Sequence, residues 1–196
     1  MRIEKPSISD LHGDTATEHR FGALAYELMQ GRDVDGEWLQ IVKMNTPKNA
    51  HDAAVYEVDF GLTADCIVVG YIDLECKPQW RDGAWPYRVT NIARYPMAHW
   101  EDDRFNGRHT NKLMRFAEKP DLSFWIAMRT DWQACWIIRA IDIFKHGVEG
   151  EQGTRYSETP LPVYHIDNAL GHLCEQAQDL TDYITTMYHE VQHAAD

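Results

Sequence analysis

The chain contains no apolar run that approaches the ~18 residues of a transmembrane helix, so we expect no membrane span. Its first residues, MRIEKPS, include no apolar core of a secretory signal peptide, and on that ground we expect a cytoplasmic protein. Nucleotide-binding loops of the Walker A and GxGxxG types are absent. Cysteine is scarce, and the four cysteines show no CxxC spacing, which argues against a zinc ribbon and a disulfide scaffold.

Positive charge is also scarce. The chain has 19 Lys and Arg against 31 Asp and Glu, a net charge of -12, which is unfavourable for binding phosphates. The deficit is uneven, because residues 146–196 hold nine acidic residues and one basic residue. Residues 77–115 instead hold eight basic and four acidic residues. This locally basic stretch is compatible with a polyanionic partner.

The 196 residues, 44% hydrophobic and 26% charged, have the balance of a globular protein. We expect one domain over 1–145, followed by an acidic loop and C-terminal helix over 146–196 that serve packing or dimerisation. The predicted fold class is α/β, with a central mixed sheet and the first helix packed on one of its faces.

Apolar spacing predicts a first helix that ends at Gly31 and a strand over 38–44. Runs rich in β-branched and aromatic residues over 54–77 predict an antiparallel meander that turns at 61–63 and at Gly70. Further predicted elements are a strand within 88–95, a helical turn over 110–118, strands over 122–128 and 134–141, and a long loop over 145–162.

The C-terminal segment has the clearest helical pattern. Its apolar residues alternate steps of three and four, which predicts one amphipathic helix over about 168–194 with Asp167 as its N-cap. The apolar seam is longer than a small sheet needs to cover, so we expect part of it to pair with a second copy in a homodimer. The seam comprises Leu170, Leu173, Ala177, Leu180, Ile184, Met187, Val191 and Ala194.

Two carboxylates and an amine fall on the predicted meander. If its hairpin turns about Gly70, Asp65 faces Glu75, and their Cβ atoms are ~5 Å apart. Lys77 then projects from the same face as Glu75, because alternate strand residues share a face. Such a carboxylate pair can share Mg²⁺ (or Mn²⁺) with phosphate oxygens, a donor set suited to phosphodiester hydrolysis. Asp59, on the preceding strand, is a rival for the role of metal ligand.

The pattern Ala64-Asp65 followed by Glu75-Cys76-Lys77 resembles the PD-(D/E)XK nuclease superfamily, with Ala64 in place of the usual proline. The likeness covers roughly residues 14–142 and is best with phage-type endonucleases and Holliday-junction resolvases. It implies a restriction-endonuclease-like αβββαβ core and a metal-dependent deoxyribonuclease.

The same resemblance implies roles for individual residues. Asp65, Glu75 and the backbone carbonyl of Cys76 would bind the metal, Lys77 would act beside it, and Glu18 on the first helix would complete the catalytic set. Glu27 is a weaker candidate for the last role. Family members often act as dimers on two-stranded substrates, which agrees with the predicted homodimer. A relative that binds nucleic acid without cutting it is an alternative.

Basic and aromatic residues follow the predicted site. Arginine and lysine can hold DNA phosphates, and exposed aromatic rings can stack on unpaired bases, although the tryptophans here can equally be core residues. The predicted DNA-binding residues are Arg81, Arg88, Arg94 and Lys112.

The segment His189-Glu190-Val191-Gln192-His193 is a literal HExxH, the motif of zinc peptidases. The apolar seam places both histidines on the outer side of the helix, and no third ligand stands at a familiar spacing. The two interpretations are a zinc metallopeptidase and a pair of exposed histidines able to capture metal.

Overall fold

The computed structural model describes residues 21–22, 24–44, 58–77, 89–93, 110–129, 134–153 and 160–194. Within them the main sheet has seven strands, in the spatial order β1 (Arg32–Val34), β2 (Glu37–Lys43), β3 (Phe60–Ala64), β4 (Ile67–Lys77), β6 (Phe124–Arg129), β7 (Cys135–Arg139) and β10 (His172–Cys174). A second sheet has the order β5 (Val89–Ala93), β9 (Leu161–Asp167) and β8 (Val148–Gln152). The helices are α2 (Tyr26–Gln30), α3 (Thr110–Glu118), α4 (Ala140–His146) and α5 (Ala177–His193), with a 3-10 turn, η2, over Asn168–Leu170.

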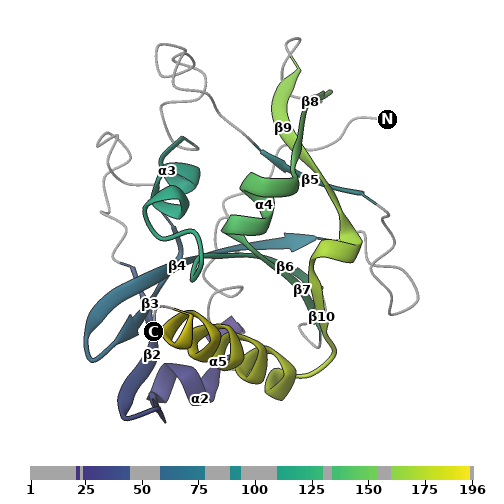
Figure 1. Ribbon diagram of the computed structural model, residues 1–196. Coiled ribbons are helices and arrows are strands. Elements are labelled where there is room, and N and C mark those ends of the chain that lie inside the picture. Colours follow the sequence, from purple (N-terminus) through teal and green to yellow (C-terminus); the bar gives the residue numbers. More distant parts are fainter. Residues whose placement is uncertain are drawn as a thin grey trace, which may run out of the picture.

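The main sheet is mixed, as the sequence predicts. Strands β1 to β4 pair antiparallel, whereas β4 and β6 pair parallel with α3 in the crossover between them. If the short edge strand β1 and strand β5 of the second sheet are set aside, the order α2-β2-β3-β4-α3-β6 agrees with the αβββαβ order that the sequence resemblance implies. Apolar clusters cover both faces of the sheet: α2 and α5 lie on one face, and α3 and α4 lie on the other together with the small sheet (Figure 1).

The β3–β4 hairpin does not turn where the sequence analysis placed it. Asp65 and Cys66 have positive φ angles of 47° and 68° and form a two-residue turn, closed by the pair Ala64 and Ile67. Primed turns of this kind match the twist of the flanking strands. The prediction of a hairpin about Gly70 is wrong, and residues 67–77 form one continuous strand.

Gly70 has a different physical role. The β3–β4 register shifts beside it, so that it lies at a bulge, and a Cβ at this position would lie 1.8 Å from the backbone oxygen of Leu122. Glycine in a strand often marks such a close approach of two backbones rather than a turn.

Several predicted elements are confirmed. The strand over 38–44 is β2, the strand within 88–95 is β5, the helical turn over 110–118 is α3, and the strands over 122–128 and 134–141 correspond to β6 and β7. Gly31 ends α2, and its N–H donates to the carbonyl of Leu28. The predicted loop over 145–162 is wrong, because β8 lies within it and β9 begins at Leu161. The predicted strand over 54–60 lies mostly outside the described residues.

The C-terminal helix is shorter than predicted. Residues 168–176 form η2 and the edge strand β10, and Asp167 caps η2 by accepting a 2.9 Å hydrogen bond from Ala169 N–H. Helix α5 begins instead with a capping box between Gln176 and Asp179. The helical periodicity continued through a segment whose backbone pairs with β7, so tertiary pairing overrode the pattern.

The apolar seam of α5 packs within the chain. Leu180, Ile184 and Tyr188 are fully buried in the cluster that covers the main sheet. Along these residues α5 offers no open apolar surface for a second copy, so this part of the helix does not support the predicted homodimer. No helix in the described part of the chain has the length and apolar character needed to span a membrane.

Candidate functional site

Asp59 lies at the start of β3, directly beside the end of β4. The backbone N–H of Leu74 donates a 2.8 Å hydrogen bond to Asp59 Oδ2, and Asp59 N–H donates to the carbonyl of Ile72 at 3.1 Å. An antiparallel hairpin brings the start of its first strand to the end of its second. The Asp59 carboxylate is thereby held next to the residue that precedes Glu75.

Glu75 is half-buried, and its carboxylate is oriented by a tryptophan. The indole N–H of Trp125, on the parallel neighbour β6, donates to Glu75 Oε1 at 3.3 Å. Trp125 is itself fully buried and packs edge-on against Trp136, with ring centroids 6.1 Å apart. A rigid donor of this kind fixes the direction of an acidic side chain, as the outer partners of metal ligands do.

The face of β4 that carries Glu75 is unusually charged. Strand alternation places Asp73 and Glu75 on the α3 and α4 side, while Ile72 and Leu74 point into the opposite cluster. Asp73 is buried, with 6% of its surface exposed, and the sequence analysis missed it. The sequence could have shown that Asp73 shares a face with Glu75, because residues at every second position of a strand lie on the same face.

A second residue missed from sequence is Arg129, at the C-terminal end of β6. It pairs with Lys77 in the parallel register, and alternation puts its half-buried side chain on the same face as Glu75. Two cationic residues thus stand at the end of the sheet where Asp59 and Glu75 lie. Sequence periodicity cannot show this, since it depends on which strands are neighbours.

Asp65 does not lie at this place. It sits in the exposed β3–β4 turn, where its carboxylate accepts a 2.8 Å hydrogen bond from Trp38 N–H. Glu75 stands eight positions beyond Ile67 on β4, which is about 26 Å at ~3.3 Å per residue. The expected cross-strand pairing of Asp65 with Glu75 is wrong, because the turn precedes Gly70. The rival aspartate, Asp59, contacts this part of β4 instead, through the N–H of Leu74.

The structure describes the remaining predicted site residues only in part. Glu18, Arg81, Arg88 and Arg94 lie outside the described residues, and for Cys76, Lys77 and Lys112 the backbone alone is described.

The rival helix residue Glu27 lies in the first turn of α2 and forms a surface ion pair with Arg32 at 3.9 Å. On α3, Arg115 is paired with Glu118 at 2.9 Å, and Tyr71 donates to the same carboxylate at 3.2 Å. Arg115 is therefore engaged in a contact within the chain.

The HExxH histidines are exposed on the last turns of α5, as predicted. They are joined by Asp35, from the turn between β1 and β2, whose Oδ2 lies 3.5 Å from His189 Nδ1 and 3.5 Å from His193 Nε2. Among the residues that the structure describes, these three form a group whose potential ligand atoms all lie within 4.8 Å of one another. The sequence analysis did not anticipate Asp35, which lies far from the motif along the chain.

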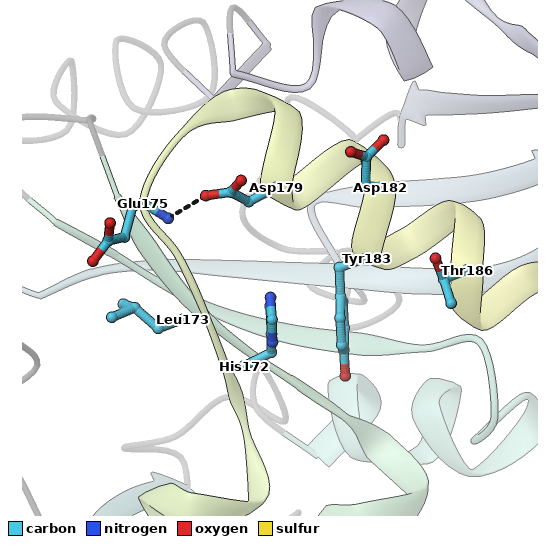
Figure 2. A pocket seen from close by; sticks show the side chains of 7 residues that line it. All are labelled: His172, Leu173, Glu175, Asp179, Asp182, Tyr183 and Thr186. Atoms are coloured by element: carbon cyan, nitrogen blue, oxygen red, sulfur yellow. Dashed lines mark hydrogen bonds between the residues drawn. The ribbon is translucent and has the colours of Figure 1, made fainter.

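An open groove of about 560 Å³ runs between the start of α5 and β10 (Figure 2). His172 stacks on Tyr183 there, with ring centroids 4.7 Å apart, and burial raises the pKa of Tyr183 to about 12. Three carboxylates, of Glu175, Asp179 and Asp182, line the same groove, so it repels phosphate and does not suit nucleic acid. None of the predicted site residues lines it.

No protein-family profile matches the chain, and no curated protein matches it. Among solved structures the chain is similar to D212, a nuclease from a fusselovirus, with a TM-score of 0.36 and 11% sequence identity over 97% of this chain and 99% of that chain. A likeness of this size carries no argument about function, so the proposal below depends on the residues of the site.

Proposed function

We propose that the chain is a metal-dependent DNA nuclease of the PD-(D/E)XK type, with Asp59, Glu75 and Lys77 as its catalytic set. The observation that carries the proposal is the 2.8 Å hydrogen bond from Leu74 N–H to Asp59 Oδ2. It brings an aspartate to the strand end that bears Glu75-Cys76-Lys77, which is the juxtaposition that the superfamily resemblance implies. The assignment differs from the sequence-based one in two respects: Asp59 replaces Asp65, and Glu18, which lies outside the described residues, is left out.

The donor set fits Mg²⁺. This ion takes one or two carboxylates and fills its other positions with water and phosphate oxygens, and Asp59 and Glu75 supply two half-buried carboxylates beside the same strand. When bound, the ion would supply charge stabilisation at the phosphoryl oxygens and a lowered pKa for water. As the resemblance implies, the backbone carbonyl of Cys76 would be a further ligand.

Residues of the chain would orient the carboxylates, the attacking water and the phosphate. Hydrogen bonds from Leu74 N–H and Trp125 Nε1 hold the two carboxylates in fixed orientations, so little reorganisation accompanies binding. Lys77 would orient the attacking water and offset negative charge that develops on the phosphate. Arg129, its neighbour on β6, would hold a phosphate of the bound strand.

Buried Asp73 would add a third carboxylate to the site. Strand alternation puts this buried carboxylate on the same face of β4 as Glu75, two residues before it. Added negative charge beside two carboxylates makes their joint ionisation costly without a cation, which favours uptake of a divalent ion.

The proposal is tested with end-labelled duplex, branched and single-stranded DNA, each incubated with Mg²⁺, with Mn²⁺ and with a chelator. We expect cleavage of at least one substrate that depends on the divalent ion, and loss of cleavage in Lys77→Met with DNA binding retained. Binding without cleavage under every metal condition would contradict the proposal and favour the non-catalytic relative.

A further inference from the structure

We propose that Asp35, His189 and His193 form a binding site for a borderline divalent transition metal such as Zn²⁺. The site would clamp the C-terminal turns of α5 to the β1–β2 hairpin. It is distinct from the carboxylate site of the proposed nuclease in both position and donor chemistry.

The geometry suits such an ion closely. His189 and His193 are one helical turn apart on the same face of α5, with ring centroids 4.3 Å apart. Asp35 Oδ2 lies 3.5 Å from a ring nitrogen of each histidine. Ligands at about 2.0–2.1 Å from a tetrahedral zinc ion are about 3.3 Å apart, so small adjustments of exposed side chains would close the site.

The donor types select the class of metal. Imidazole nitrogens with one carboxylate favour zinc, copper and nickel, whereas magnesium and calcium prefer oxygen ligands alone. All three side chains are exposed, so a fourth position would be filled by water.

The two elements that carry the ligands are already held together. Asp35 has a positive φ of 55° in the tight turn between β1 and β2, where Gly36 N–H donates to Asp33 at 3.2 Å. The hydroxyl of buried Tyr188, next to His189, donates to Glu37 on β2. Farther back along α5, Asp182 lies 3.6 Å from Arg32 of β1. These contacts fix the spacing between helix and hairpin before any metal binds, which lowers the cost of assembling the site.

The arrangement points to a structural clamp rather than a peptidase centre. The three ligands stand on an exposed surface, and the groove farther along α5 is lined by none of them. A metal that bridges the helix and the hairpin stabilises the folded state, because the unfolded chain does not bring these residues together.

The 196-residue chain is titrated with ZnCl₂ in saturating Mg²⁺, on a Cys66→Ser background that removes the exposed free thiol. Native mass spectrometry gives the stoichiometry, calorimetry the affinity, and thermal unfolding the stabilisation. We expect one zinc per chain, a higher melting temperature, and at least about tenfold weaker binding in each of Asp35→Asn, His189→Ala and His193→Ala.

Two controls keep this test independent of the proposed nuclease. Glu190→Gln alters a neighbouring carboxylate on the same helix, and Asp59→Asn alters the nuclease site, so both should bind zinc as the Cys66→Ser parent does. Absence of stoichiometric zinc binding, or unchanged affinity in the three ligand variants, would overturn the inference. DNA cleavage by Asp59→Asn has no bearing on that result.

Discussion

The carboxylate of Asp59 accepts a 2.8 Å hydrogen bond from the backbone N–H of Leu74. This contact joins the residue that precedes β3 to the residue that precedes Glu75 on β4. Two acidic residues sixteen positions apart in the chain, Asp59 and Glu75, are thereby brought to the same part of the sheet. Asp65, which is closer to Glu75 in sequence, is carried to the opposite end of the hairpin. Proximity along the chain is therefore a poor guide to this site.

The first prediction concerns the bulge at Gly70. A Cβ there would lie 1.8 Å from the backbone oxygen of Leu122, an atom that cannot rotate away. We expect Gly70→Ala to lower the free energy of unfolding by about 3 kcal/mol or more, as measured by urea denaturation. Gly153→Ala is the matched control, since a Cβ at Gly153 meets nothing within 4 Å. Equal stability of the two variants would show that Gly70 and the backbone of Leu122 are not this close.

The second prediction concerns the seam of α5. Leu180 is fully buried against the main sheet, so a charge placed there must be desolvated. We expect Leu180→Glu to unfold the chain or lower its stability by more than about 3 kcal/mol. Thr186→Glu adds the same charge on the exposed side of the same helix and should change stability little. If Leu180→Glu stays folded and only changes sedimentation, the seam is an intermolecular surface.

A third prediction concerns Tyr188. Burial, together with the hydrogen bond to Glu37 and its negative charge, raises the pKa of the Tyr188 hydroxyl, which therefore stays protonated and keeps donating across the neutral range. Tyr188→Phe should cost about 1–2 kcal/mol in thermal or chemical unfolding, because the donor to Glu37 is lost while the ring still packs. Tyr26→Phe, at an exposed position of α2, serves as the control and should cost nothing measurable.

A fourth prediction concerns Cys135 on β7 and Cys174 on β10, two free cysteines that are neighbours in the strand register. The hydrogen bond with Cys174 and burial raise the pKa of the Cys135 thiol, so it remains neutral when an unfolded thiol would ionise. The folded state then keeps a proton that the unfolded state loses, and stability should fall as pH rises above about 8.5.

Urea denaturation at pH values below and above about 8.5 measures this fall in stability, and alkylation followed by peptide mapping checks the burial on which it depends. Exposed Cys66 should be modified rapidly in the native protein, whereas Cys135 and Cys174 should react only on unfolding. Equal rates for Cys66 and Cys135 at pH 8 would contradict it.

Much of the fold was predictable from local patterns. Strands β2, β6 and β7 and helix α3 follow runs whose apolar spacing is unambiguous, and Gly31 ends α2 by adopting a positive φ of 90°. The errors in the predicted elements arose where one residue type is compatible with two local structures. Gly70 can mark a turn or a close backbone approach, and only the position of Leu122, in the segment that leads into β6, decides between them.

The chemistry of the proposed site was predictable from the sequence, whereas the residues that compose it were predictable only in part. Glu75 and Lys77 follow from strand alternation, but the choice between Asp59 and Asp65 depends on the hairpin register, which the two-residue turn at Asp65 and Cys66 sets. Arg129 and Asp35 could not be found from the sequence, because each depends on which elements become neighbours in space.

The most direct test of the proposed site compares the Mg²⁺-dependent cleavage rate of Asp59→Asn with that of Asp65→Asn on the same labelled DNA. Both substitutions replace a carboxylate by an amide of equal size, and Asp65 lies in an exposed turn about 26 Å along the hairpin from Glu75. We expect Asp59→Asn to lose more than about 100-fold in rate with DNA binding retained, and Asp65→Asn to cut like the wild type. Normal cleavage by Asp59→Asn, with loss of cleavage in Asp65→Asn, would contradict the account.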